Sequence, residues 1–387
     1  MAIRSIREFI SLEASAGIIL FTTALLALFI DNSALASYYE GFFNLKFSVS
    51  FAGFTLEKPL LSWVNEGFMT IFFLLVGLEI KRELFVGELN SVSKAMLPLI
   101  AAMGGMVIPA AIYLGINWHD PLALKGWAIP TATDTAFSLG ILSLLGKRIP
   151  ESLKIFLTAL AIFDDIGAII IMAVFYTSRI SLLMLLIALV LVCVLILLNY
   201  CRVQKISAYA FVGILLWLCV LKSGVHATMA GIVIAMTIPI NLTKSSAESP
   251  LHRLERKLHP LVAFGILPLF AFANAGVSFS GLAIHHLFLS VPLGIACGLF
   301  FGKQFGIWSF TMLGVKCGIS KLPANITSLG LYGLSLVAGV GFTMSLFIGT
   351  LAFHSVASYA AFIRMGVIFG SFFSGVLGYL LLRYAYA

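Results

Sequence analysis

The sequence has few charged residues for its length. Asp, Glu, Lys and Arg make up only 10% of the 387 residues, against roughly a quarter in ordinary soluble domains, whereas 61% of the residues are hydrophobic. A soluble chain of this size could not bury so much apolar surface, so lipid must cover much of it. The apolar runs are continuous rather than alternating, which favours membrane-spanning helices over a β-barrel.

The sequence also lacks a cysteine pattern that would hold a metal or a redox pair. Its five cysteines lie in or beside apolar runs, and we expect them to be small packing residues. We expect no cleavable signal peptide, no cofactor and no enzymatic activity. The formal net charge of +8 does not require a nucleic-acid partner, because basic loops at a membrane surface account for it.

Apolar runs long enough to cross a bilayer recur twelve times, since a helical crossing needs about 20 residues. We therefore predict an all-α polytopic membrane protein that forms one integral membrane domain over residues 1–387. The predicted spans are 14–30, 60–80, 95–116, 124–145, 153–176, 181–198, 206–221, 226–240, 258–277, 287–310, 327–351 and 357–382. An even number of spans places both termini on one side.

Lys and Arg are distributed unequally between the two sets of loops. Seventeen lie on the side of the termini, and the opposite side has only five: Lys46, Lys58, Lys125, Arg179 and Lys222. Cytoplasmic loops carry the excess of basic residues, so we predict that both termini are cytoplasmic.

The longest outside loop, about 31–59, has a β pattern. Apolar residues at 47, 49 and 51 alternate with polar or small ones, and the alternation resumes at 54 and 56 after Ala52 and Gly53. This pattern predicts a short β-hairpin, with a loop of local β character as the alternative. Because an isolated hairpin is marginal in water, we predict a homodimer that pairs through residues 45–58.

Two of the predicted spans contain residues that interrupt a helix. The fourth carries PTATDT at 130–135, and the eleventh carries AGVGFT at 338–343. Proline removes a backbone donor and glycine weakens a helix. Interrupted helices at matching places in two halves are typical of transport sites. We predict an inverted repeat of spans three to five and ten to twelve, each with a broken middle member.

Asp164 and Asp165 are the strongest functional signal, because they lie in the middle of an otherwise apolar span. A charge near the centre of such a helix costs at least about 2.5–3.5 kcal/mol. Carboxylate oxygens are hard ligands that suit a small hard cation. A site that holds either protons or a cation, but not both, is an exchanger. The alternative is a structural acid pair satisfied by its neighbours.

Three further residues extend this candidate site. Asp134 and Thr133 lie in the first break, where unwound carbonyls and the hydroxyl are available to a cation. Asp134 is also a candidate helix cap, and the two roles are compatible. Lys303 is the membrane cation that most needs a partner, and Asp164 or Asp165 is the natural one. Snorkelling of Lys303 to the interface is the alternative.

Five stretches of the sequence match one family in order. The chain resembles the bacterial NhaA-type sodium/proton antiporters over essentially its whole length, through FFLLVGLEIKRE at 72–83, ATDTAF at 132–137, FDDIG at 163–167, LPLFAFANAG at 267–276 and GFTMS at 341–345. That family is itself an established example of inverted repeats.

The resemblance implies a twelve-helix protein of the bacterial inner membrane whose broken fourth and eleventh helices cross. It implies electrogenic exchange of cytoplasmic Na+ or Li+ for external protons by alternating access, in the service of pH and sodium homeostasis. By matching position, Asp165 is the more direct cation ligand, Asp164 is the partner of Lys303, and Asp134 is the acid of the crossing with Thr133 beside it.

The resemblance also implies a cytoplasmic pH-sensing cluster, with solvated charges that merely fix topology as the alternative. Its positions here are Glu79, Arg82, Glu83 and Glu255, and His226 occupies another pH-linked position. Arg256 stands where the family leads us to expect a histidine. Arginine stays charged at every physiological pH, whereas histidine titrates near ~6.5, so the pH profile does not carry over.

Three other classes compete with an exchanger. A sodium symporter for an organic anion would need an additional substrate pocket. An intramembrane aspartyl protease uses two membrane carboxylates on separate helices, which adjacent Asp164 and Asp165 do not match. A channel would not move protons against their gradient in response to sodium.

Overall fold

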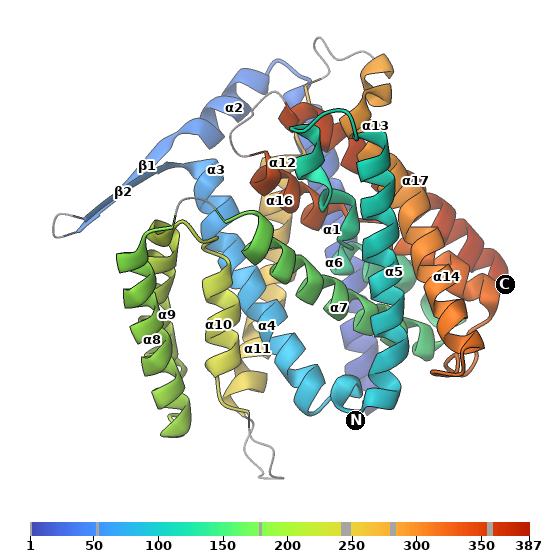
Figure 1. The fold of residues 1–387 in the computed structure, drawn as a ribbon, viewed down its shortest axis with the longest axis horizontal. Coiled ribbons are helices and arrows are strands. Elements are labelled where there is room, and N and C mark those ends of the chain that lie inside the picture. The colour runs from blue at the N-terminus through green and yellow to red at the C-terminus, as the bar shows by residue number, and fades with distance from the viewer. Residues whose placement is uncertain (1, 52–53, 178–179, 241–248, 279–283, 354–358) are drawn as a thin grey trace. The chain divides into compact units, whose positions relative to one another are not determined.

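The computed structural model describes residues 2–51, 54–177, 180–240, 249–278, 284–353 and 359–387 (Figure 1). The predicted turn at Ala52 and Gly53 lies outside these residues. So do two of the basic residues counted above: Arg179 of the opposite side and Lys244 of the side of the termini. The chain forms two compact units. The first comprises Met1–Ala36, Ser91–Ala168 and Asn274–Ala387, and the second comprises Ser37–Asn90 and Ile169–Ala273. Each unit is described by itself.

The first unit is built from long helices and two helices that are interrupted. Its helices are α1 (Ala2–Asp31), α5 (Val92–Ile116), α6 (Thr135–Leu144), most of α7 (Glu151–Phe175), α13 (Ser290–Cys297), α14 (Lys303–Lys316), α15 (Ser328–Val337), α16 (Phe342–Ala352) and α17 (Ala360–Ala385). Short 3-10 turns at Ala123–Gly126 and Ile129–Thr131 precede α6, and a π-helical turn at Gly298–Gly302 joins α13 to α14.

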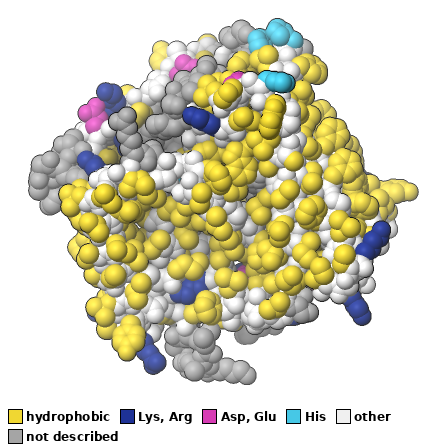
Figure 2. All heavy atoms as spheres, viewed as in Figure 1, with side chains coloured by type: hydrophobic (Ala, Val, Ile, Leu, Met, Phe, Trp, Pro, Cys, Tyr) yellow, Lys and Arg dark blue, Asp and Glu magenta, His cyan; other side chains and the backbone are white. Residues whose placement is uncertain are grey.

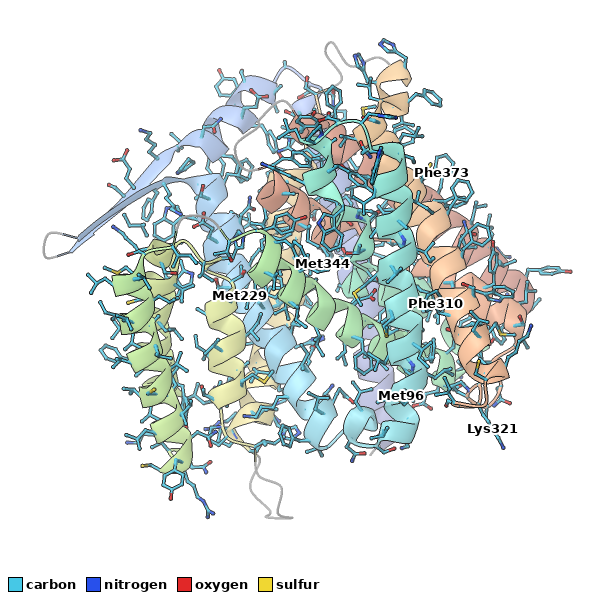
Figure 3. All side chains as sticks on the ribbon, in the orientation of Figure 1. Met96, Met229, Phe310, Lys321, Met344 and Phe373 are labelled. Atoms are coloured by element: carbon cyan, nitrogen blue, oxygen red, sulfur yellow. The ribbon has the colours of Figure 1, made fainter. Side chains whose placement is uncertain are left out.

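Two glycines set the contact between α5 and α14. A Cβ atom on Gly104 would lie 2.2 Å from the carbonyl oxygen of Gly306, and a Cβ on Gly306 would lie 2.2 Å from that of Gly104. The two backbones therefore touch, which only glycine allows at both positions. Figure 3 shows Phe310 of α14 beside α5, with Met96 and Lys321 toward one end of this pair. This close packing fixes the helix that carries Lys303.

The second unit combines helices with a β-hairpin. Its helices are α2 (Ala36–Asn44), α3 (Leu60–Ser62), α4 (Met69–Phe85), α8 (Leu182–Tyr200), α9 (Ile206–Ser223), α10 (Met229–Thr237), α11 (Pro250–Leu261) and α12 (Leu267–Ala275). A π-helical stretch, Trp63–Phe68, makes α3 and α4 one continuous helix, and Val262–Ile266 does the same for α11 and α12.

The predicted hairpin is confirmed. Strand β1 (Lys46–Phe51) pairs antiparallel with β2 (Phe54–Pro59), in a register that sets Lys46 opposite Pro59 and Val49 opposite Leu56. In Figure 1 the hairpin projects from the start of α3. It forms a sheet of two strands within the described residues, so each strand has one hydrogen-bonded neighbour there.

Most of the predicted spans are long helices. Within the described residues, nine helices are long and apolar enough to cross a membrane, and α15 with α16, bent by 46°, forms a tenth candidate. The two other predicted spans are shorter: 226–240 contains the nine-residue α10, and 124–145 contains the two 3-10 turns followed by α6. Hydrophobic side chains cover most of the face shown in Figure 2, as a lipid-facing surface requires.

Candidate functional site

The two predicted breaks lie against each other in the first unit. The backbone N–H of Asp134 donates to the carbonyl of Val340 at 2.7 Å, and the Ser345 hydroxyl donates to the carbonyl of Ile129 at 2.7 Å. A Cβ atom on Gly341 would lie 2.8 Å from the carbonyl oxygen of Ala132, so this approach requires a glycine. Each break thus satisfies backbone groups that the other leaves without a helical partner.

Asp134 holds the beginnings of two half-helices at once. Its Oδ1 accepts the backbone N–H of Phe137 at 3.0 Å, which caps α6. Its Oδ2 accepts both the N–H and the hydroxyl of Thr343, at 2.9 and 2.6 Å, in the first turn of α16. The side chain is buried, and two positive helix ends surround its carboxylate. The capping role weighed for Asp134 is confirmed, and it serves both helices.

Asp164 of α7 is the centre of the buried charges. Its Oδ2 accepts a hydrogen bond from Lys303 Nζ at 2.5 Å and lies 2.7 Å from the Thr133 hydroxyl, which is also 2.9 Å from the carbonyl of Ala338. Lys303 and Asp164 are 0% and 1% exposed. Asp164 Oδ1 accepts no hydrogen bond from the described part of the chain. The predicted pairing of Lys303 with Asp164 is therefore present, and one carboxylate oxygen remains for another ligand.

Asp165 follows Asp164 on α7 and is 7% exposed. Adjacent helix positions point about 100° apart, so the two carboxylates face different surroundings. The charge of Asp165 also acts on the Lys303 ammonium. Lys303 is therefore hydrogen-bonded to Asp164 and lies within the electrostatic influence of Asp165.

A local irregularity precedes Lys303. The π-helical turn Gly298–Gly302 ends directly before it, and such turns occur mostly as single insertions in α-helices, frequently at functional sites. A Cβ atom on Gly105 of α5 would lie 3.6 Å from Lys303 Cδ, so the lysine stem passes along α5. The turn and the glycine contact with α5 together direct the ammonium toward α7 rather than toward the membrane surface.

The predicted pH-sensing residues lie in the second unit, and the structure joins three of them. Arg82 contacts Glu83 Oε1 at 2.8 Å and Glu255 Oε1 at 2.9 Å, which links α4 to α11. Glu79 lies one helical turn before Glu83 on α4. Because the Arg82 and Glu255 side chains are 35% and 11% exposed, the Arg82–Glu255 pair is screened less than a surface ion pair.

His226 does not join this group. Its Nε2 lies 2.7 Å from the carbonyl of Tyr176, and the residue precedes the first turn of α10. Lys81, next to Arg82, instead binds the other end of α10: its Nζ donates to the carbonyls of Met236 and Ile238 at 2.7 and 2.6 Å.

Sequence reasoning missed two residues with clear roles. Thr343 binds Asp134 through both its N–H and its hydroxyl, and its place just after the second break was the available signal. Lys81 is 7% exposed and binds helix carbonyls. The sequence alone counts it only as a basic loop residue after the predicted span 60–80. The continuation of α4 past Lys81, which lies four residues before the helix ends at Phe85, is what places this lysine in the helix.

Two interrupted helices that meet at a buried cluster of acids and one lysine define a membrane transporter of the secondary-active class. Comparison with known proteins agrees. The family model described as Na+/H+ antiporter 1 matches residues 7–382. The chain is 53% identical to a Na(+)/H(+) antiporter NhaA of Rhodospirillum rubrum, over 99% of this chain and 98% of that protein. It is 51% identical to a Na(+)/H(+) antiporter NhaA 1 of Syntrophotalea carbinolica, over 100% and 97% of the two chains. The chain therefore belongs to the Na+/H+ antiporter 1 family and is a multi-pass membrane protein.

Proposed function

We propose that this protein exchanges cytoplasmic Na+ or Li+ for external protons at Asp164 and Asp165. The observation that carries the proposal is the Asp164 carboxylate, which is buried, bonded through Oδ2 to Lys303 and Thr133, and without a hydrogen-bond partner at Oδ1 among the described residues. Charge in a membrane interior is costly unless it is paired, so such an acid is a functional site by default.

Ion exchange follows from competition for these carboxylates. A Na+ ion that binds Asp165 and Asp164 competes with the Lys303 ammonium for Asp164, because the ion and the ammonium are both cations that bind the same carboxylate. The hydroxyl of Thr133 and the carbonyl of Ala338, which lie beside Asp164, are the kind of oxygen ligands that hard cations take. Protons neutralise the same acids and so displace the metal ion. Two acids at one site allow more than one proton to move per sodium ion, which makes the exchange electrogenic.

Alternating access is the transport mode that a single mid-membrane site requires. Deprotonated acids take up Na+ from the cytoplasm, the site then opens to the other side, and external protons release the ion. Asp134 neutralises the two positive half-helix ends beside this site, so the crossing itself adds little net charge to it. Exchange in this direction removes sodium and returns protons to the cytoplasm, as pH and sodium homeostasis demand.

The membrane context follows from charge distribution and from the hairpin. The excess of Lys and Arg in the loops on the side of the termini supports cytoplasmic termini in the bacterial inner membrane.

The two-stranded sheet is too small to be stable alone, which supports a homodimer in which a second copy extends it. The pairs that link Arg82 to Glu83 and Glu255 support a pH-sensing role for this group, with Glu79 beside it and His226 as a separate pH-linked position.

Proteoliposomes that contain a pH-sensitive dye test the exchange directly. We expect Na+ and Li+ gradients, but not a K+ gradient, to drive proton movement against its own gradient. We expect Asp165→Asn to abolish this flux, because an amide neither ionises nor accepts a proton. Glu151→Gln, on the first turn of the same helix, is the matched control and should retain it. Full sodium-driven flux in Asp165→Asn would refute the assignment.

A further inference from the structure

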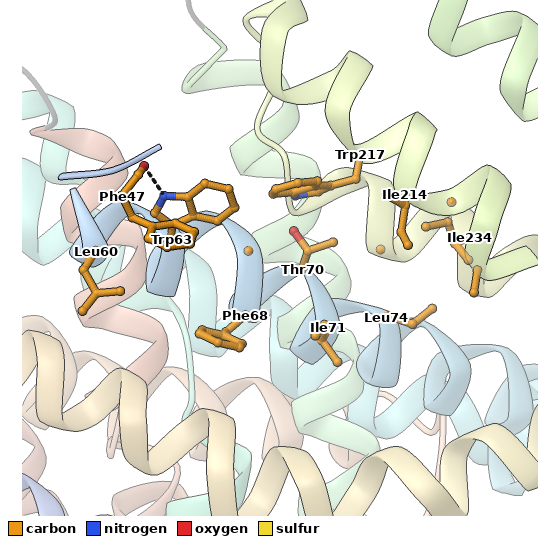
Figure 4. A pocket seen from close by; sticks show the side chains of 14 residues that line it. Phe47, Leu60, Trp63, Phe68, Thr70, Ile71, Leu74, Ile214, Trp217 and Ile234 are labelled. Atoms are coloured by element: carbon orange, nitrogen blue, oxygen red, sulfur yellow. Dashed lines mark hydrogen bonds between the residues drawn. The ribbon is translucent and has the colours of Figure 1, made fainter. Parts of the chain in front are cut away.

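A second candidate site lies within the second unit. A cavity of ≈ 510 Å³ is enclosed by the stretch 60–74 of α3 and α4, by α9, by α10, and by Phe47 of β1 (Figure 4). This volume is in the range of small-molecule sites, about 300–1,000 Å³. The π-helical stretch Trp63–Phe68 forms one wall, and no role in ion exchange has been assigned to it.

The cavity offers a ligand almost no polar group. Three lining side chains carry hydrogen-bond donors, and each donor is already used. Trp63 Nε1 donates to the carbonyl of Phe47 at 3.3 Å. Trp217 Nε1 and the Thr70 hydroxyl donate to the carbonyl of Glu66 at 3.3 and 2.5 Å. The polar atoms of a ligand would find no hydrogen-bond partner inside the cavity, which is unfavourable. The lining therefore favours a hydrocarbon ligand.

The cavity is long as well as apolar. Its lining runs from Leu60 to Leu74 along one helix, fifteen residues and so fourteen steps of helical rise. At about 1.5 Å of rise per residue this is roughly 21 Å, more than half of the ~30 Å hydrocarbon thickness of a bilayer. Figure 4 shows Leu60 and Trp63 toward one end, Leu74 and Ile234 toward the other, and Trp217 between them. A slot of this length parallel to a spanning helix suits an extended chain rather than a compact molecule.

The opening of the cavity is continuous with the lipid-facing surface. Two lining residues, Phe68 and Ile214, are 39% and 59% exposed. Phe211 and Leu215, next to Ile214 on the spanning helix α9, are exposed and apolar too. Such a surface is surrounded by lipid, so lipid acyl chains are the hydrocarbon that can reach the opening.

We propose that this cavity binds one acyl chain of a membrane phospholipid. Trp63, near the Leu60 end of the cavity, marks the headgroup end of the chain, because indole rings favour the level of the membrane interface. The chain fills the space between α4 and α9, whereas α10 already packs directly on α4: a Cβ atom on Gly231 would lie 2.3 Å from the carbonyl oxygen of Thr70. A second copy of the protein is a different occupant, and the test below separates the two.

Gly67 provides the variant that tests the site. A Cβ atom there would find only ring carbons of Trp63 and Trp217, both at 3.9 Å, so the cavity has room for a side chain. Gly67→Leu therefore fills the slot with little displacement of its neighbours. Gly41→Leu on α2 is the matched control, because a Cβ there meets nothing within 4 Å and Gly41 does not line the cavity.

Tryptophan fluorescence reports the bound chain. Trp118, Trp127 and Trp308 are replaced by Phe, which leaves Trp63 and Trp217. The protein is reconstituted in dioleoyl phosphatidylcholine with increasing fractions of a phosphatidylcholine whose acyl chain carries bromine. We expect quenching that saturates at a low brominated fraction, a large loss of this component in Gly67→Leu, and no loss in Gly41→Leu. Ile214→Phe at the exposed opening should act in the same direction without altering the interior.

Two results would overturn the proposal. Quenching that rises in proportion to the brominated fraction and is equal in Gly67→Leu and Gly41→Leu would show ordinary surrounding lipid only. Quenching that is absent in the assembled protein and emerges on dilution to monomers would show that a second copy covers the cavity. Neither result depends on sodium or proton transport.

Discussion

Asp134 Oδ2 receives both of its hydrogen bonds from Thr343, one from the backbone N–H and one from the hydroxyl, which gives a prediction at the scale of a single residue. Thr343→Val removes the hydroxyl and keeps the backbone N–H. A lost hydrogen bond to a charged group costs about 1.5–3 kcal/mol, more than one between neutral groups. We expect a lower midpoint of thermal unfolding in detergent and a weaker apparent affinity for Na+.

Two substitutions control for the change of side chain. Thr343→Ser restores the hydroxyl and should recover most of both properties. Thr350→Val, on the same helix, removes only a hydrogen bond to the carbonyl of Phe347 and should cost less. Equal losses in Thr343→Val and Thr350→Val would contradict the dual cap.

Residues of the site were predictable where a charge stood alone in apolar sequence. Asp164, Asp165 and Lys303 follow from the cost of charge in hydrocarbon, and the structure pairs Lys303 with Asp164. Thr343 was not predictable in the same way, since threonine is ordinary in a spanning helix. Its role appears only when the two breaks meet, which no local pattern specifies. The part of Asp165 in transport stays a prediction.

The element α10 depends on side chains of its neighbours for its last carbonyls. Lys81 of α4 binds the carbonyls of Met236 and Ile238, and Asn199 of α8 donates to that of Thr237 at 2.5 Å. These carbonyls have no partner within a nine-residue helix that ends at Thr237. Lys81 therefore acts as the cap that attaches the end of α10 to α4.

Lys81→Met tests this cap. We expect faster amide hydrogen exchange in residues 229–240, because the released carbonyls weaken the last turn of α10. Lys81→Arg should exchange at an intermediate rate, and Lys94→Met, an exposed lysine at the start of α5, should leave these residues unchanged. Unchanged exchange in Lys81→Met would show that packing alone holds α10.

The sequence predicted which segments are helices and strands, but it did not predict the π-helical stretches within the helices. Hydrophobic length identified the spanning helices, and alternation identified β1 and β2. The three π-helical stretches were not predicted, because one extra residue in a helical turn leaves no periodic trace in a continuous apolar run. One of them positions Lys303 and another forms the wall of the apolar cavity.

For the whole molecule, the hairpin and the ion site belong to different compact units. Replacing residues 45–58 with a short Gly-Ser linker should convert a dimer into monomers, as measured by mass photometry in detergent. Sodium-driven proton flux per protomer should persist, because the acids, Lys303 and the two breaks are contained in the first unit. A linker variant that remains dimeric would place the interface elsewhere. The single integral domain predicted for residues 1–387 stays a prediction, whereas the helical architecture is confirmed.

The backbone contact between Gly104 and Gly306 constrains how Lys303 can move. Helix α14 cannot move closer to α5 at this point, because the two main chains are already in contact and no side chain lies between them that could change its conformation. The ammonium can therefore leave Asp164 by torsion of its own four-carbon stem, but not by a movement of α14 closer to α5. A side chain at Gly104 or Gly306 would push α5 and α14 apart and so shift Lys303 relative to Asp164, although neither glycine contacts that acid.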